Sequence, residues 1–160
     1  TPPQHPLALS GLDGVIERLV LLVQQEVGER IRCRPGSSAY SALSVRMQLL
    51  AHCQSVCAVP PRCFQPPPKV MSEVIALDPL PPEARLAPAV AKRVEQLLKR
   101  CFAARRKMLR NSLAGLLEPG AMEELAQQLG LNLQQRPQDL APSHWVALAE
   151  GLNQGAVPPS

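Results

Sequence analysis

Leu19-Val20-Leu21-Leu22-Val23 is a continuous apolar run of strand length. A strand without polar residues is typical of burial on both faces, as in a parallel or mixed sheet covered by helices. Gln25 to Arg32 follows with Val27 and Ile31 four residues apart and charged residues between them, which predicts a short helix. A buried strand followed directly by an amphipathic helix favours an α/β fold.

The chain beyond this helix extends the pattern. Residues 35–38 (P-G-S-S) predict a loop, and apolar residues at 43, 47 and 50 predict a second helix. Residues 55–59 and 70–77 alternate well enough to predict two further strands. These elements make only half of an α/β sheet, and the apolar edge strand that they expose is a liability in a soluble protein. We therefore expect a fragment that is cut at its amino end.

The second half of the chain is predicted to be helical throughout. Pro88 suits the first turn of a helix whose apolar residues 90, 94, 97, 98, 101 and 102 form one stripe. Further helices are predicted at 108–117, 121–129 and 142–152, with Gly130 as a helix stop and Trp145 in the core. We expect two domains, residues 1–80 and residues 81–160. The first begins with a loop or frayed end over residues 1–14, and the second ends in a disordered tail.

The composition is that of a folded protein of about one domain. The chain has 160 residues, of which 46% are apolar, and no apolar run is long enough to span a membrane. The five cysteines are an odd number, and without a secretion signal they predict reduced thiols and a cytoplasmic location. Cys53 and Cys57, beside His52, lack the second ligand pair of a zinc finger, so we expect no metal site.

Positive charge is concentrated in one segment. Residues 85–110 hold nine of the 17 basic residues and a single acid, Glu95, although the whole chain carries only +4. This asymmetry favours a polyanionic partner, nucleic acid before membrane, over the solvated helix face that mixed charges usually form. Lys92, Lys99 and Arg106 recur every seven residues and lie on the polar side if the helix continues that far. The candidate nucleic-acid-binding residues are Lys69, Lys92, Arg93, Lys99, Arg100, Arg105, Arg106, Lys107 and Arg110.

A Pro-rich loop joins the last two predicted strands. Five of the 18 prolines fall within residues 60–68, and Phe64 lies among them. Proline fixes φ, so the loop is rigid, and an aromatic at its tip can serve as a stacking plate for a planar ligand. Phe64 can equally plug the core while the prolines cap a strand. A third interpretation, a proline-rich ligand for an SH3-type domain, is disfavoured by the flanking strands.

Four motifs, in order along the chain, carry a family resemblance. Residues 64–70 (F-Q-P-P-P-K-V), with Ser72 beyond them, resemble the F-x-P-P-P-K-V-x-S segment of the rRNA adenine N6-dimethyltransferases of the KsgA type, which are related to the Erm methylases. Residues 22–27 (L-V-Q-Q-E-V) are similar to the family's M-x-Q-K-E-V. Residues 40–45 (Y-S-A-L-S-V) resemble its Y-x-x-L-S-V, and residues 105–111 (R-R-K-M-L-R-N) resemble its R-R-K-x-L-R-N.

The resemblance implies a Rossmann-like methyltransferase sheet, of which this chain carries the carboxyl half, followed by a small helical rRNA-binding domain. It also implies S-adenosyl-L-methionine as the methyl donor. The family's Gly-rich turn and its N-[LI]-P-[YF] motif have no counterpart in this sequence. We therefore expect a missing amino-terminal half to bind the cofactor and no residue of this chain to do so. By resemblance, Phe64 is the catalytic candidate, because it would stack on the target adenine.

The implied activity is N6-dimethylation of two adjacent adenines near the 3′ end of small-subunit (16S) rRNA, in ribosome biogenesis. The implied partner is this rRNA in a pre-30S particle, and the complete enzyme is expected to be a monomer. As a fragment, the chain is expected to be inactive alone. Two alternatives stay open: a non-catalytic RNA-binding adaptor with the same fold, and an Erm-type 23S rRNA adenine methylase. The three-proline loop and the R-R-K-x-L-R-N segment resemble the KsgA-type dimethyltransferases better than the Erm-type methylases.

Overall fold

The computed structural model describes residues 17–155. The loop predicted at residues 1–14 therefore lies outside the described residues, as does the end of the predicted tail, residues 156–160. None of the helices within the described range is long and apolar enough to cross a bilayer.

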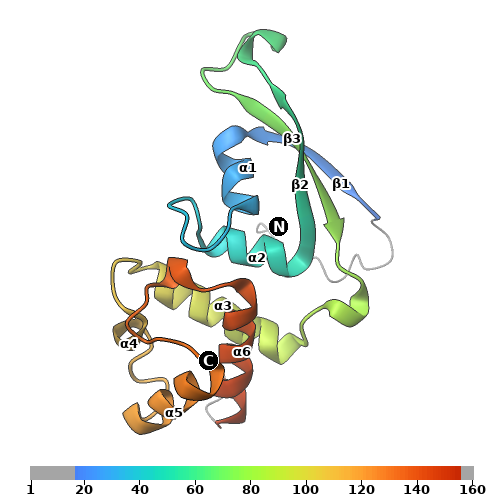
Figure 1. Cartoon of the computed structure of the whole chain (residues 1–160). Helices are drawn as coiled ribbons and strands as arrows, with labels where there is room; N and C mark the ends of the chain where they lie inside the picture. Colours follow the sequence, from blue (N-terminus) through green and yellow to red (C-terminus); the bar gives the residue numbers. More distant parts are fainter. Residues whose placement is uncertain (1–16, 156–160) are drawn as a thin grey trace, which may run out of the picture. The chain divides into compact units, whose positions relative to one another are not determined.

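The described residues form two compact units, which the chain connects three times (Figure 1). The first unit comprises residues 17–33 and 43–85, and the second comprises residues 34–42 and 86–155. Residues 34–42 follow a helix of the first unit in sequence, yet they pack in the second unit. No sequence signal predicted this exchange.

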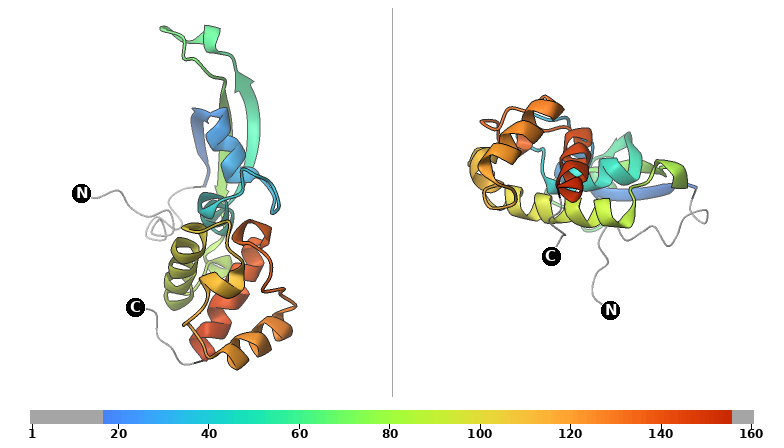
Figure 2. Two further views of the ribbon diagram at one scale, coloured as in Figure 1. Left: turned by 90° about the vertical axis from the view of Figure 1, so that its left-hand side faces the viewer. Right: turned by 90° about the horizontal axis from the view of Figure 1, so that it is seen from below.

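The first unit is a three-stranded antiparallel sheet with two helices on one face (Figure 1, Figure 2). The strands are β1 (Leu19–Gln24), β2 (Ala51–Val59) and β3 (Ser72–Pro79), in the spatial order β1-β3-β2. The helices are α1 (Gln25–Arg32) and α2 (Ala42–Leu50), both close to their predicted bounds. The core between sheet and helices centres on Ile31, Leu50, Ile75 and Leu77.

The burial of β1 differs from the prediction. Leu19, Leu21 and Val23 pack against the core, but Val20 is 58% exposed and Leu22 is 53% exposed. The prediction of burial on both faces is therefore wrong for this strand, because α1 and α2 cover one face of the sheet only. Both strand pairings are antiparallel, so the described sheet contains no parallel pair.

The β2–β3 hairpin carries the Pro-rich loop beyond the first turn of α1 (Figure 1, Figure 2). The strands pair as far as Val59 and Ser72, so the loop spans residues 60–71 and contains a short 3-10 turn, η2 (Pro61–Cys63). Strand β2 begins at Ala51, four residues before its predicted start at 55, and its register shifts between Ser55 and Cys57. Such a bulge bends a strand and strengthens its twist.

The second unit is helical, with α3 (Pro88–Phe102), α4 (Leu109–Ser112), α5 (Pro119–Leu129) and α6 (Pro142–Gln154). Pro88 begins α3 and Gly130 ends α5 in the left-handed conformation, as predicted. Helix α3 ends at Phe102 and does not reach Arg106, while the helix predicted at 108–117 forms a single turn. Trp145 is fully buried, which confirms its predicted place in the core, and its ring lies 5.7 Å from the ring of Phe102.

Candidate nucleic-acid interface

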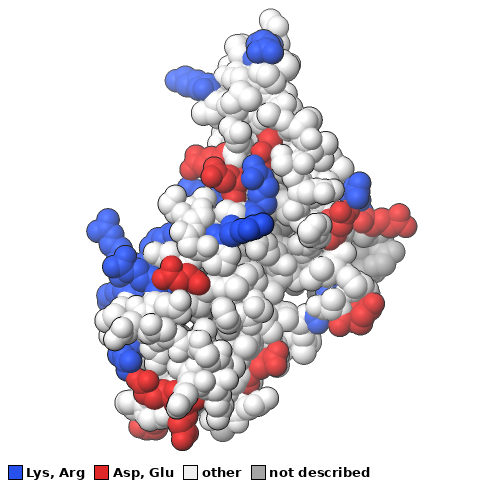
Figure 3. Space-filling view, in the orientation of Figure 1, with Lys and Arg blue, Asp and Glu red and all other residues white. Residues whose placement is uncertain are grey.

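Four basic side chains are exposed along α3 and in the turn after it. Lys92 and Lys99 lie on the helix, and Arg106 and Lys107 lie in the turn after it. None of the four has a hydrogen-bond or ion-pair partner within residues 17–155. Figure 3 shows Lys and Arg side chains gathered over the end of α3 and the turn that follows. These four residues, the exposed cation set, are free to contact a polyanion.

Arg93, by contrast, points inward. It is 1% exposed, and its Nε donates to Oδ1 of Asn153 at 2.9 Å while Nη1 donates to Oε1 of Gln96 at 2.8 Å. Burial lowers the pKa of its guanidinium from the ordinary value. Because Asn153 lies on α6, this arginine links two helices of the second unit and does not present its guanidinium to a phosphate. We therefore remove Arg93 from the RNA-binding set.

Arg100 and Arg105 use their guanidinium groups inside the second unit. Arg100 Nε donates to the carbonyl of Ser112 at 2.6 Å, and its Nη2 donates to the carbonyl of Ala114. Arg105 is half-buried, lies 5.9 Å from the centre of the Phe102 ring and donates to the carbonyl of Tyr40 at 2.9 Å. Arg100 therefore binds the end of α4 and the segment that follows it, and Arg105 binds residues 34–42.

The Tyr40 contact explains why residues 34–42 belong to the second unit. Tyr40 is fully buried, and its hydroxyl donates to the carbonyl of Leu140 at 2.6 Å. The amide of Gly36 donates to the carbonyl of Gln138 at 2.7 Å. Arg105 thus ties the turn after α3 to residues 34–42, and Gly36 and Tyr40 bind that segment to Gln138 and Leu140. Of the remaining candidate residues, Arg110 is exposed and pairs with Glu123.

The Pro-rich loop lies in the first unit. It carries Phe64 and two basic residues. Phe64 is half-buried and follows η2, where its amide donates to the carbonyl of Pro61 at 3.1 Å. Arg62 and Lys69 are exposed. Sequence reasoning had not singled out Arg62. The sequence did contain a signal for this residue, because Arg62 stands two residues before the only aromatic of the loop.

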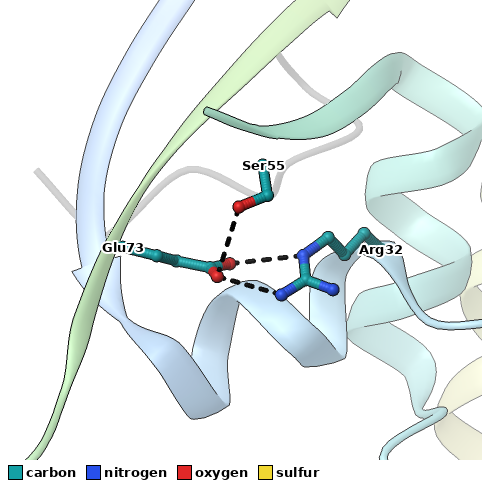
Figure 4. A network of polar contacts seen from close by, with 3 residues as sticks. All are labelled: Arg32, Ser55 and Glu73. Atoms are coloured by element: carbon teal, nitrogen blue, oxygen red, sulfur yellow. Dashed lines mark hydrogen bonds and ion pairs between the residues drawn. The ribbon is translucent and has the colours of Figure 1, made fainter. Parts of the chain in front are cut away.

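A buried ion pair fixes the root of this hairpin, and sequence reasoning missed it (Figure 4). The Glu73 side chain is 3% exposed, and Arg32 donates to its two oxygens from Nε at 3.3 Å and from Nη2 at 2.9 Å. The Ser55 hydroxyl, on β2, lies 3.5 Å from Oε2 of the same carboxylate. The carboxylate raises the pKa of the Arg32 guanidinium above its ordinary value. Glu73 follows the last paired residue of the hairpin, Ser72, so the pair ties α1 to the base of the loop.

Gly28 makes room for this carboxylate. A Cβ at that position would lie 1.8 Å from Oε1 of Glu73, which no side chain can tolerate without movement of the buried acid. The signal available in the sequence was an acid directly before the apolar residues 74–77 of a strand, Glu73 between Ser72 and Val74. The buried position of the Glu73 carboxylate requires a residue without a side chain at position 28 of α1.

The cysteines form no cluster with other ligands. Cys57 and Cys63 are exposed, Cys101 is buried in α3, and no group of three or more His, Cys, Asp or Glu within the described residues could hold a metal ion. Burial raises the pKa of the Cys101 thiol to about 12. Burial also raises the pKa of Cys53, and the Arg32 charge opposes that shift.

The fold matches solved structures of rRNA-modifying enzymes. A crystal structure of a dimethyladenosine transferase from Plasmodium falciparum covers 96% of this chain and 64% of its own length, with a TM-score of 0.80 at 22% identity. The 23S rRNA methyltransferase ErmE covers 88% of this chain and 57% of its own, with a TM-score of 0.64 at 26% identity. The chain therefore has a methyltransferase-type α/β portion and a helical portion, the fold class that the sequence predicted.

A family model of ribosomal RNA adenine dimethylases matches residues 9–154. The chain belongs to the ribosomal RNA adenine dimethylase family, which confirms the resemblance carried by the four motifs. Ribosomal RNA small subunit methyltransferase A of Synechococcus sp. (strain CC9605) is 67% identical over 144 residues, which are 90% of this chain and 53% of that protein. The protein of the same name in Prochlorococcus marinus (strain MIT 9303) is 62% identical over 142 residues, 89% of this chain and 51% of its own. The chain spans about half the length of the curated relatives that it matches.

Members of this methyltransferase family use S-adenosyl-L-methionine, and the described residues do not fit that cofactor. Among the described residues, the glycines with positive φ are Gly36, Gly115 and Gly130, and all three belong to the second unit. In the first unit, β1 passes directly into α1 without a glycine turn, since Gln24 is followed by Gln25. No described residue is therefore assigned to the cofactor.

Proposed function

We propose that this chain supplies the carboxyl-terminal portion of an enzyme that dimethylates N6 of two adjacent adenines near the 3′ end of small-subunit rRNA, during ribosome biogenesis in the cytoplasm. The identity of 67% with a small subunit methyltransferase A carries this proposal. S-adenosyl-L-methionine binds, on this view, to a portion that the relatives contain and this chain does not span. The chain alone is then expected to bind no cofactor and to transfer no methyl group.

The two candidate regions take different tasks. The exposed cation set of the second unit neutralises rRNA phosphates, which positions the substrate without choosing a base. The Pro-rich loop of the first unit receives the adenine after it leaves the helical stack, with Phe64 stacked on the base. Stacking orients the exocyclic amine, whose lone pair is delocalised into the ring, toward the methyl donor. The Glu73–Arg32 pair holds the root of the loop that performs this task.

An Erm-type 23S rRNA methylase is the second candidate, because ErmE shares the fold with a TM-score of 0.64. The names of the relatives favour the small subunit. A non-catalytic adaptor is the remaining alternative, and only an activity measurement separates it from an enzyme.

A chimera tests the proposal directly. This chain replaces the matching 144 residues of the Synechococcus CC9605 relative, and methyl transfer from S-adenosyl-L-methionine is measured on undermethylated small subunits and on 23S rRNA. We expect N6-dimethyladenosine at two adjacent positions of the small-subunit rRNA. Transfer to 23S rRNA instead would establish the Erm type. A folded chimera that binds rRNA and transfers nothing would point to the adaptor.

Variants of Phe64 in the same chimera separate stacking from core packing. Phe64→Ala removes a stacking surface worth ~1–3 kcal/mol per base, so methyl transfer falls while RNA affinity changes little. Phe64→Tyr keeps a π-face and retains much of the activity, whereas Phe64→Leu keeps only apolar bulk. Equal rescue by Leu and Tyr, with a lower melting temperature for Ala, would show that Phe64 is a core plug.

A further inference from the structure

The hairpin loop, residues 60–71, carries an isolated pair of positive charges. Arg62 and Lys69 are the only Lys, Arg, Asp or Glu residues between Met47 and Ser72. Both are exposed, and neither has a hydrogen-bond or ion-pair partner among the described residues. Local acids therefore do not neutralise them. The loop presents a small positive surface of its own, separate in sequence from the exposed cation set.

The backbone fixes Arg62 in place relative to Phe64. The carbonyl of Pro60 accepts from the amide of Cys63 at 3.0 Å, and the carbonyl of Pro61 accepts from the amide of Phe64 at 3.1 Å. These two bonds close η2 with Arg62 in its centre. Five prolines of the loop fix φ at their positions, so little conformational entropy remains to be lost when a ligand is held.

The root of the loop is equally fixed. The strands pair up to Val59 and Ser72, and Glu73, next to Ser72, is held by Arg32 and Ser55. The amide of Gln25 donates to the carbonyl of Met71 at 3.0 Å, which ties the start of α1 to the end of the loop. A loop held at both its root and its turn keeps the backbone positions of Phe64 and Arg62 in one arrangement.

We propose that this loop is a binding site for one unstacked nucleotide of single-stranded RNA, in which Phe64 stacks on the base and Arg62 binds the adjacent phosphate. Two residues span at most ~7 Å of backbone, so a single nucleotide can reach both side chains. A guanidinium binds phosphate in a bidentate manner, which orients the nucleotide as well as attracting it. Lys69 adds a point charge at the other end of the loop. The inference rests on the proposed role of Phe64 and makes Arg62 a positioning residue for the target base.

Single-stranded RNA is the partner that this surface fits better than a duplex. Bases in a duplex are stacked on each other, so a lone aromatic ring finds no free base face there, whereas unpaired loop bases can be splayed onto it. Two charges are also few for a surface that binds by phosphate neutralisation alone. The combination of one ring and one guanidinium group is therefore specific to an exposed nucleotide.

The test uses the full chain with two RNA probes of equal length, a hairpin with 2-aminopurine in a single-stranded loop and a blunt duplex. Arg62→Gln is compared with Arg34→Gln, which removes the same charge from another exposed site without a partner within the described residues. We expect Arg62→Gln to weaken binding of the loop probe three- to tenfold and to reduce its log–log salt slope by ~0.7, with duplex affinity unchanged. Arg34→Gln changes neither probe.

The fluorescence of 2-aminopurine separates the roles of the two side chains. Under saturating protein, Arg62→Gln retains the fluorescence change of the wild-type chain, whereas Phe64→Leu loses it. If Arg62→Gln matches Arg34→Gln, or weakens the binding of both probes equally, the proposed nucleotide site is wrong. RNA binding by the second unit then still stands. If the wild-type chain binds neither probe, RNA binding by this chain fails as a whole.

Discussion

The hairpin loop and the basic segment at residues 92–110 offer their charges in opposite ways. The loop carries two cations, and both face solvent. The basic segment carries eight, but Arg93 is buried and Arg100 and Arg105 bind backbone carbonyls of their own unit. The dense segment therefore presents far less free charge than its sequence indicates. Charge density along a sequence identifies candidate binding residues. The fold decides which of their side chains are exposed to a partner.

The largest effect is expected at the root of the hairpin. Arg32→Ala leaves the Glu73 carboxylate buried without its partner, which costs about 3–5 kcal/mol in a fully buried pair. Because the Arg32 side chain is 34% exposed, we expect ~2–3 kcal/mol. Amide hydrogen exchange in β3 measures this as a lower opening free energy.

Arg30→Ala is the matched control on the same helix. Its partner, Glu26, is 71% exposed, and an exposed pair four residues apart is worth ~0.3–0.5 kcal/mol. If both variants change exchange in β3 equally, the buried pair does not hold the loop root.

A smaller effect separates structural from exposed arginines in the second unit. Arg105→Gln loses a charged hydrogen bond to the Tyr40 carbonyl and a contact with the Phe102 ring, which together contribute ~1–2 kcal/mol at a half-buried site. Arg106→Gln removes an exposed charge and changes stability by less than ~0.5 kcal/mol. Urea unfolding followed by Trp145 fluorescence measures both.

RNA binding by the same two variants is expected to show the reverse order. Arg106→Gln reduces the salt slope by about one phosphate contact, and Arg105→Gln does so only to the extent that the turn loosens. Equal stability losses for the two variants would contradict the division into structural and exposed arginines.

The smallest effect concerns the buried face of α3. The pKa of the Cys101 thiol is about 12 in the folded chain, above the ordinary value of a thiol, so the unfolded chain releases its proton first as the pH rises. Stability from this group is complete below about pH 9 and is lost progressively above it. With an ordinary thiol pKa of 9.0, the loss between pH 8.5 and 9.5 is about 0.7 kcal/mol.

Urea unfolding at these two pH values checks the sign. Cys101→Ala is expected to remove this part of the alkaline decline, whatever its effect on stability at neutral pH. Cys57→Ala, which removes an exposed thiol, leaves the decline in place. A decline that persists in Cys101→Ala would assign it to another group.

Much of the fold could be predicted from local patterns. Apolar spacing predicted α1, α2 and α3, and Pro88 and Gly130 predicted helix ends through their fixed backbone preferences. Other features depend on contacts distant in sequence. Nothing near Tyr40 indicates that its hydroxyl meets Leu140, one hundred residues away, and nothing near Val20 shows that helices cover only the opposite face.

The candidate site was predictable in the same uneven way. Phe64 and the exposed cation set stand out as residue types in a pattern. The inward direction of Arg93 did not, because it lies beside Val94 at the edge of the apolar stripe and bonds Asn153 on another helix. The Glu73–Arg32 pair joins residues 41 apart in sequence, and only the antiparallel register brings them together.

One measurement tests the central claim, that exposed cations of the second unit carry RNA binding. The logarithm of the association constant for a blunt RNA duplex is measured against the logarithm of salt concentration, for the wild-type chain and for Lys99→Gln/Arg106→Gln/Lys107→Gln. At ~0.7–0.9 per phosphate contact, we predict that the triple variant flattens the slope by roughly two to three. An unchanged slope would contradict the account, because these three side chains would then be only a solvated face.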